Sequence, residues 1–102
     1  MSSHEIVCIA RLIAKEGMTA SLLQVLQGLV KPSKSEPGCL SYQLHCDIEN
    51  PNIFTFVDRF KDQAAFDFHC EAEYIKEAFD HLIPPLVESM DITMHQDVEL
   101  SA

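Results

Sequence analysis

The alternation between strand-type and helix-type hydrophobic patterns is the feature that most limits how this chain can fold. Apolar residues recur every second position in a half-buried strand and about every 3.6 positions in an amphipathic helix, so the two patterns are distinguishable. Strand patterns cover residues 5–13, 39–47, 53–60 and 91–100, whereas helix patterns cover residues 18–30 and 63 to about 82. The predicted order is therefore strand, helix, strand, strand, helix, strand.

Capping residues and prolines support the boundaries of both predicted helices. Thr19 is a candidate cap for the first helix, and Pro32 is expected to lie beyond its end because proline does not continue a helix. Asp62 is a candidate cap for the second helix, which the pair Pro84-Pro85 stops. The apolar stripe predicted for this second helix consists of Ala65, Phe68, Ala72, Ile75 and Phe79.

A hairpin is predicted in the middle of the chain. After the turn signal at residues 35–38 (SEPG), the segment 39–47 alternates apolar and polar residues, as expected for a strand with two different faces. Residues 49–52 (ENPN) form a short connection to the segment 53–60, which favours antiparallel pairing of the two strands. The apolar set of the first strand is Leu40, Tyr42, Leu44 and Cys46.

The element order is the split βαβ pattern of a ferredoxin-like βαββαβ sandwich, an α+β fold with an antiparallel sheet and helices on one face. The segments 5–13 and 53–60 are apolar on both faces, although helices would cover only one. A second copy of the chain is the simplest cover for the other face, so we expect a homodimer formed through the sheet faces. A chain of 102 residues is expected to form a single domain spanning residues 1–102.

The charge balance limits the expected partners and location. Asp and Glu number 16 and Lys and Arg number 7, which gives a formal net charge of −9 at pH 7. Such a charge repels phosphate backbones and anionic lipids, so neither nucleic acid nor a membrane is an expected partner. The sequence shows no basic leader before a long apolar run and no segment of membrane-spanning length, so a cytoplasmic location is expected.

The cysteines are expected to be free thiols, because a reducing compartment does not favour disulfides. They show no Cys-x-x-Cys spacing, and the adjacent pairs His45-Cys46 and His69-Cys70 are not arranged to chelate one ion. No metal site is therefore predicted. The cysteines are Cys8, Cys39, Cys46 and Cys70.

A run of short motifs over residues 36–79 closely resembles the antibiotic biosynthesis monooxygenase family of small dimeric α+β barrels. These motifs match in order and spacing over nearly half of the chain. The resemblance implies the dimeric α+β barrel fold and a site in the cleft between the sheet and the helices. The motifs are Glu36-Pro37-Gly38-Cys39, Ser41-Tyr42, the acidic-Pro-Asn hairpin, Asp58 to Phe60 before Lys61-Asp62, and Ala64-Ala65 followed by His69.

The resemblance implies a monooxygenase that oxidises a quinol or polycyclic phenol with O2 and without a cofactor, so its other expected partner is a small aromatic molecule. Other members of the family isomerise a small phosphorylated signal or degrade haem. An isomerase of a small oxygenated metabolite and a non-catalytic, small-molecule-binding stress-response dimer therefore stay open as alternatives. Phe60 stands where a tryptophan is common in the family, and the chain contains no tryptophan, which argues against the haem-degrading branch.

Two positions carry the catalytic hypothesis that the resemblance implies. The family's recurrent acidic residue maps to Asp58 and its helix histidine to His69, whereas its second histidine is replaced by Tyr74. A neutral His69 imidazole would take the phenolic proton, and Asp58 would orient the imidazole ring. A packed His69 bonded to a carboxylate or carbonyl, and an Asp58 paired with Arg11 or Lys61, remain the structural alternatives.

Aromatic residues supply the candidate substrate-binding surface. Phe54, Phe56 and Phe60 share a strand face with Asp58 and could form a flat apolar wall, although such a stripe is also typical of core packing. The hydroxyl groups of Tyr42 and Tyr74 are candidate hydrogen-bond donors to the substrate, with core packing and surface exposure as their respective alternatives.

Overall fold

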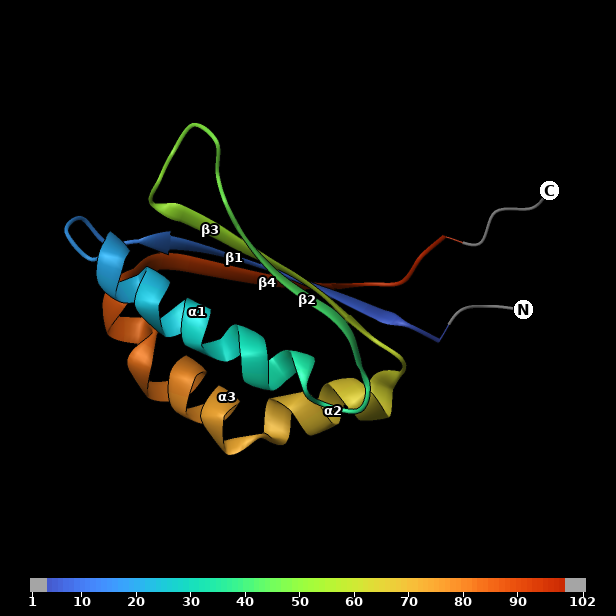
Figure 1. Ribbon diagram of the computed structural model, residues 1–102. Helices are drawn as coiled ribbons and strands as arrows, with labels where there is room; N and C mark the ends of the chain where they lie inside the picture. The colour runs from blue at the N-terminus through green and yellow to red at the C-terminus, as the bar shows by residue number, and fades with distance from the viewer. Residues whose placement is uncertain (1–3, 99–102) are drawn as a thin grey trace.

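One antiparallel sheet of four strands forms half of the sandwich in the computed structural model, which describes residues 4–98 (Figure 1). The order across the sheet is β2-β3-β1-β4, and each neighbouring pair is antiparallel. This is the predicted ferredoxin-like arrangement, so the expected fold class is confirmed. The strands are β1 (Ile6–Ala14), β2 (Cys39–Cys46), β3 (Ile53–Phe60) and β4 (Val87–His95).

The helices lie together on one face of this sheet (Figure 1). They are α1 (Thr19–Lys34), α2 (Gln63–Glu71) and α3 (Glu73–Glu77), followed by a π-helical turn η1 (Ala78–Leu82) and a 3-10 turn η2 (Pro84–Leu86). Within residues 4–98, no helix is long and apolar enough to cross a membrane.

The core lies between the sheet and the helices because alternate residues of the central strands point toward the helical layer. Leu12 of β1 and Phe56 and Phe60 of β3 are at most 1% exposed. They pack with Leu22 and Leu26 from one stripe of α1 in a single buried cluster, although Phe60 is also close to the site described below. Each fully buried side chain of this size contributes roughly 1.5–3 kcal/mol to folding.

Helix α1 is longer than its sequence pattern predicted. It continues to Lys34 with Pro32 inside its last turn, and the expectation that Pro32 lies beyond the helix was wrong. Proline lacks the backbone N–H that would bond the carbonyl four positions earlier, and a position in the last turn confines this loss to the end of the helix. The predicted cap was also wrong: Met18 precedes the helix without a side-chain cap, and the Thr19 hydroxyl bonds the Asn52 side chain.

The second helical region is not one continuous helix, which corrects its predicted stripe. Asp62 caps α2 as expected, with Oδ1 accepting from the Ala65 amide at 2.8 Å. The chain then becomes extended at Ala72, where ψ is 135°, before α3 begins. Within α2 the buried side is formed by Ala65 and His69, so Phe68 is 60% exposed, and the break at Ala72 separates α2 from the rest of the predicted stripe.

The predicted outer strands also need correction. The pairing of β2 with β3 shifts between Cys39 and Ser41, so Leu40 is 52% exposed rather than part of the buried set. The last strand begins and ends earlier than residues 91–100, and Val98 lies beyond it at 82% exposure. Residues 99 and 100 of that expected strand lie outside the described residues.

Candidate active site

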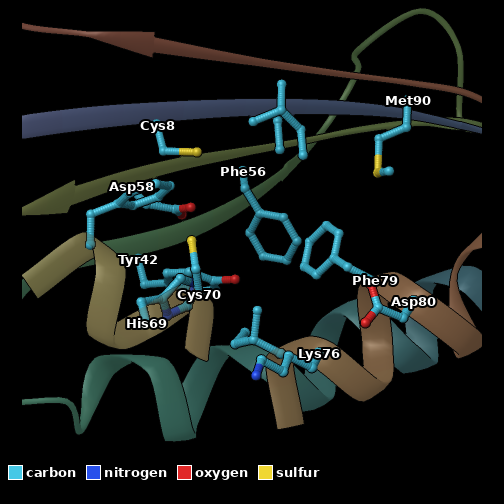
Figure 2. A pocket seen from close by; sticks show the side chains of 14 residues that line it. Cys8, Tyr42, Phe56, Asp58, His69, Cys70, Lys76, Phe79, Asp80 and Met90 are labelled. Carbon is cyan, nitrogen blue, oxygen red and sulfur yellow. The ribbon is translucent and has the colours of Figure 1, made fainter. Parts of the chain in front are cut away.

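A pocket of about 380 Å³ opens between the sheet and the α2–α3 side of the helical layer (Figure 2). Phe56, Met90 and Ile92 contribute apolar surface from the strands, and Phe66 and Phe79 contribute it from the helical layer. Such a predominantly apolar cavity with a few polar groups is typical of a small-molecule site. The polar groups are gathered mainly at one end.

The histidine of this polar end is held rigidly by α2. His69 lies about two turns after the Asp62 cap and is 5% exposed. Aromatic rings surround it: its centroid lies 4.9 Å from that of Phe60, 5.4 Å from that of Tyr42 and 6.5 Å from that of Phe66. The ring therefore has little freedom to rotate, and it forms part of the pocket wall.

Glu36, a residue not predicted to belong to the site, fixes the orientation of His69. The Nδ1 atom of His69 lies 3.1 Å from Oε1 and 3.0 Å from Oε2 of Glu36. The Tyr74 hydroxyl also donates to Oε2, and Glu36 itself is 8% exposed. Donation from Nδ1–H to a carboxylate leaves Nε2 as the acceptor of a neutral imidazole, which is the arrangement of a histidine base.

The turn that carries Glu36 reaches α2 because residue 38 is a glycine. A Cβ atom on Gly38 would collide with the Ala65 Cβ and lie 3.3 Å from the Ala65 Cα. The Lys61 amide also donates to the Gly38 carbonyl at 2.9 Å. Close approach at Gly38 therefore brings the Glu36 carboxylate to the helix that holds His69.

Asp58 occupies the same pocket but makes no hydrogen bond to His69, in contrast to its expected orienting role. It is 4% exposed, and its Oδ1 atom has no hydrogen-bond partner among the described residues. Its neighbours across the strands are Cys8 and Tyr42. Burial raises the pKa of the Asp58 carboxyl to about 8, so the group is mostly protonated at neutral pH.

Among the described residues, the alternative reading of Asp58 as the partner of Arg11 or Lys61 finds no ion pair either. The cation next to it in sequence, Arg59, points to the opposite face of the sheet, as alternation along a strand requires. There its Nη1 atom lies 3.4 Å from Glu5 and 3.1 Å from Asp97. Within residues 4–98, Asp58 thus remains a buried carboxyl without a salt bridge.

The structure separates the predicted aromatic residues into three groups. Phe56 and Tyr42 line the pocket together with His69 and Asp58. Phe54 and Phe60 share the strand face of Asp58 but are buried in the core outside the pocket lining. Tyr74 lies behind the pocket wall, where it bonds Glu36.

Several residues in and around the pocket are given no role by the sequence analysis. Glu36 belongs to a motif that also predicts a turn, so the sequence analysis assigns its side chain no role. The presence of a carboxylate in that motif is the one sequence signal that could have indicated a role. Cys70, Lys76 and Asp80 belong to segments whose register changes at the Ala72 break and at the π-helical turn.

The two thiols of the pocket are neutral at physiological pH. Cys8 and Cys70 come from β1 and α2 and both line the pocket (Figure 2). Burial, and secondarily the charge of Asp58, raises the pKa of Cys8 to about 12, and burial also raises that of Cys70. All four cysteines are free, and residues 4–98 contain no cluster of three His, Cys, Asp or Glu side chains arranged to hold a metal ion.

Comparison with known proteins gives consistent relatives. The chain is 28% identical over 94 residues to an uncharacterized protein, sll1783, of Synechocystis sp.; the match covers 92% of this chain and spans 64% of that protein's length. It is 31% identical over 71 residues to YcnE of Bacillus subtilis, which is described only provisionally as a monooxygenase, covering 70% of this chain and 75% of YcnE.

A solved structure and a family model complete the comparison. The crystal structure of SO0527 from Shewanella oneidensis superposes with a TM-score of 0.90 at 37% identity, covering 93% of this chain and 92% of that one. The model of the family described as "Antibiotic biosynthesis monooxygenase" matches residues 5–81. The chain belongs to the antibiotic biosynthesis monooxygenase family.

Proposed function

We propose that this protein is a monooxygenase that oxidises a quinol or polycyclic phenol with O2, without a bound cofactor, and that His69 is its base. The observation that carries the proposal is the buried Glu36–His69 pair in the wall of an apolar pocket. The family supports monooxygenase activity at a general level. The choice of an aromatic substrate rests on the shape and lining of the pocket.

The geometry suits proton removal from a phenol. Nδ1–H of His69 donates to Glu36, so Nε2 can accept the phenolic proton, and Glu36 stabilises the imidazolium that forms. The resulting phenolate is a far better electron donor than the phenol and transfers an electron to O2. Collapse of the radical pair forms a C–O bond and a peroxide.

The remaining steps balance without another reactant. Cleavage of the O–O bond leaves one oxygen atom on the ring, and the second departs as water after receiving a proton from the imidazolium. For a hydroquinone the organic product is a hydroxyquinone, and the substrate supplies all four electrons that reduce O2. The protein's task is therefore to bind, orient and deprotonate an aromatic molecule that is already electron-rich.

Oxygen consumption tests this proposal directly. Purified protein is treated with a chelator, given no flavin, and assayed against a panel of hydroquinones beside His69→Ala and the surface variant His81→Ala. We expect protein-dependent uptake that falls about 10²–10⁴-fold in His69→Ala and is unchanged in His81→Ala. Equal uptake by wild type and His69→Ala, or none above autoxidation, would contradict the proposal.

An isomerase is the second candidate, because a base and a protonated acid line one pocket. His69 could remove a proton while the Asp58 carboxyl, whose pKa burial raises to about 8, supplies one. Such a reaction would proceed without O2. Anaerobic turnover of a small hydroxyketone at the aerobic rate would favour this candidate over the monooxygenase.

We also propose that a second copy of the chain covers the helix-free face of the sheet. Ile9 and Ile13 of β1 and Ile53 and Val57 of β3 lie on that face and are only partly buried within one chain. Burial of this apolar strip would stabilise a homodimer. Light scattering at micromolar concentration should give twice the mass of the chain, and the mass of one chain would rule the dimer out.

A further inference from the structure

The unpartnered oxygen of Asp58 is the feature of the pocket that the proposed base does not use. Nearly all buried polar atoms in proteins have a hydrogen-bond partner, and a missing one costs about 1–3 kcal/mol. Oδ1 of Asp58 has no such partner in the described part of the chain, although the residue is 4% exposed. A group bound in the pocket is the natural candidate to satisfy it.

Within residues 4–98, no lysine or arginine side chain pairs with Asp58. Figure 2 shows the Asp58 carboxyl turned into the pocket, with Lys76 and Asp80 displaced from it along the cavity. Lys76 is exposed and pairs with Glu71 at 3.1 Å. The titratable groups near Asp58 from the packed elements are Cys8 on β1, Cys39 and Tyr42 on β2, and His69 and Cys70 on α2.

We propose that Asp58 is a substrate-binding acid, whose neutral carboxyl donates a hydrogen bond to a carbonyl or phenolic oxygen of an aromatic ligand in this pocket. The pKa of about 8 that burial gives the group agrees with this role, because a donor at neutral pH must keep its proton. As a statement about the reaction, the inference rests on the proposed function. It narrows the substrate to aromatic rings with two oxygen groups, one that is deprotonated by His69 and one that accepts a hydrogen bond from Asp58.

The second oxygen has a role in the chemistry as well as in binding. When His69 removes the phenolic proton, negative charge spreads through the aromatic system to any conjugated oxygen. A hydrogen bond from a fixed donor to that oxygen is stronger when the oxygen carries negative charge than when it is neutral. Asp58 would therefore favour the reactive anion without itself taking a proton from the substrate.

A pair of inert ligands tests the binding role. Tetralone is a bicyclic aromatic ketone, and tetralin is the same skeleton without the carbonyl oxygen. Their dissociation constants are measured at pH 7 by titration of backbone amide chemical shifts, for wild type, Asp58→Asn and Asp58→Leu. The quantity compared is the ratio of the tetralin constant to the tetralone constant, which cancels the general affinity of each pocket for apolar rings.

We expect this ratio to be about tenfold higher in wild type than in Asp58→Leu, because only the wild-type side chain donates to the ketone. Asp58→Asn, which keeps an N–H donor of similar size, should retain most of the wild-type preference. Raising the pH from 7 to 9 should lower the wild-type ratio several-fold and leave that of Asp58→Asn unchanged.

Two results would overturn the inference. One is an undiminished preference for tetralone in Asp58→Leu; the other is the same pH dependence in Asp58→Asn as in wild type. Should Asp58→Leu fail to fold by circular dichroism, the comparison of wild type with Asp58→Asn across pH decides alone.

The outcome is separable from that of the proposed function, because no arm of the test requires O2 or turnover. The expected binding ratios together with no oxygen uptake would remove the monooxygenase and keep the ligand site. If oxygen uptake depends on His69 but the binding ratios are unchanged in the Asp58 variants, the monooxygenase proposal is kept and the role of Asp58 in ligand binding is removed.

Discussion

Asp58 lines the pocket and Glu36 lies behind the His69 ring of its wall, and the surroundings of these two buried carboxyl groups differ in kind. Glu36 is 8% exposed and accepts hydrogen bonds from the His69 ring and the Tyr74 hydroxyl. Asp58 is 4% exposed and keeps one oxygen without any partner in residues 4–98. Burial is similar, so the supply of donors distinguishes the two groups.

The difference shows that position along the chain decides which carboxyl can orient the histidine. Glu36 approaches α2 from a turn, where the missing side chain of Gly38 allows contact. Asp58 lies within β3, where the neighbouring strands use their backbone donors in the sheet. The residues directly opposite Asp58 are Cys8 and Tyr42. Two residues of one chemical type therefore receive different tasks from their environment.

The largest expected effect of this contrast is on stability against pH. The pKa of Asp58 is raised from about 4 in an unfolded chain to about 8 in the fold, so the folded state binds the extra proton between these values. The contribution of Asp58 to the free energy of unfolding is complete below pH 4. It is lost as the pH rises to 8, which lowers the free energy of unfolding by roughly 5 kcal/mol. Asp58→Asn cannot ionise and should lack this decline.

Urea unfolding of both proteins between pH 5 and pH 9 measures the difference. The variant Asp91→Asn, which changes an exposed carboxylate on β4, serves as the control and should follow wild type. Parallel curves for wild type and Asp58→Asn would show that Asp58 ionises normally, and the contrast with Glu36 would disappear.

The next largest effect is expected from Glu36→Gln. A neutral amide can present N–H to His69 instead of an acceptor, which disturbs the tautomer and removes the charge that stabilises the imidazolium. Oxygen uptake should fall about 10²–10³-fold while the tetralone preference stays near wild type. Glu49→Gln changes an exposed carboxylate and is the matched control. Equal oxygen uptake by Glu36→Gln and Glu49→Gln would show that Glu36 does not support His69 as the base.

The close packing between the turn at Gly38 and helix α2 can be disturbed without changing a polar side chain. Gly38→Ala places a methyl group against Ala65, so the turn and α2 must separate, at a cost of about 1–3 kcal/mol. Gly28→Ala meets nothing within 4 Å and should stabilise α1 by up to about 1 kcal/mol. Thermal unfolding compares the two, and equal shifts would mean that close packing at Gly38 has no energetic role.

The sequence predicted the sheet and its pairing because strand patterns and turn residues act locally. It predicted less well wherever the outcome depended on tertiary contacts. The pattern predicts that Pro32 lies beyond the helix, yet α1 continues past it. Ala72 carries no breaker signal, yet the chain is extended there, and Phe68 of the predicted stripe is exposed. These two departures concern the helical layer, whereas the sheet departs from its prediction at Leu40 and in the bounds of β4.

The sequence predicts which residues belong to the candidate site better than it predicts the hydrogen bonds between them. The resemblance singled out His69 and Asp58, and the structure places both in one pocket. It could not reveal that Glu36, which is 33 positions from His69, would bond the imidazole, because that contact depends on how the turn packs on α2. Hydrogen bonds between residues so far apart in the sequence depend on the tertiary fold, and no hydrophobic periodicity in the sequence predicts them.

The smallest expected effect comes from Tyr74, which touches only the Glu36 side of the comparison. Tyr74→Phe removes one donor from Oε2 but leaves the His69 contact, so Glu36 is loosened rather than lost. Because one hydrogen bond to a charged group contributes roughly 1.5–3 kcal/mol and water can replace part of it, oxygen uptake should fall about three- to tenfold. The pH dependence of stability, which belongs to Asp58, should be unchanged, as unfolding of the variant across pH would show. A change in that dependence as large as the one expected for Asp58→Asn would mean that the two carboxyl groups are coupled and cannot be treated as separate centres.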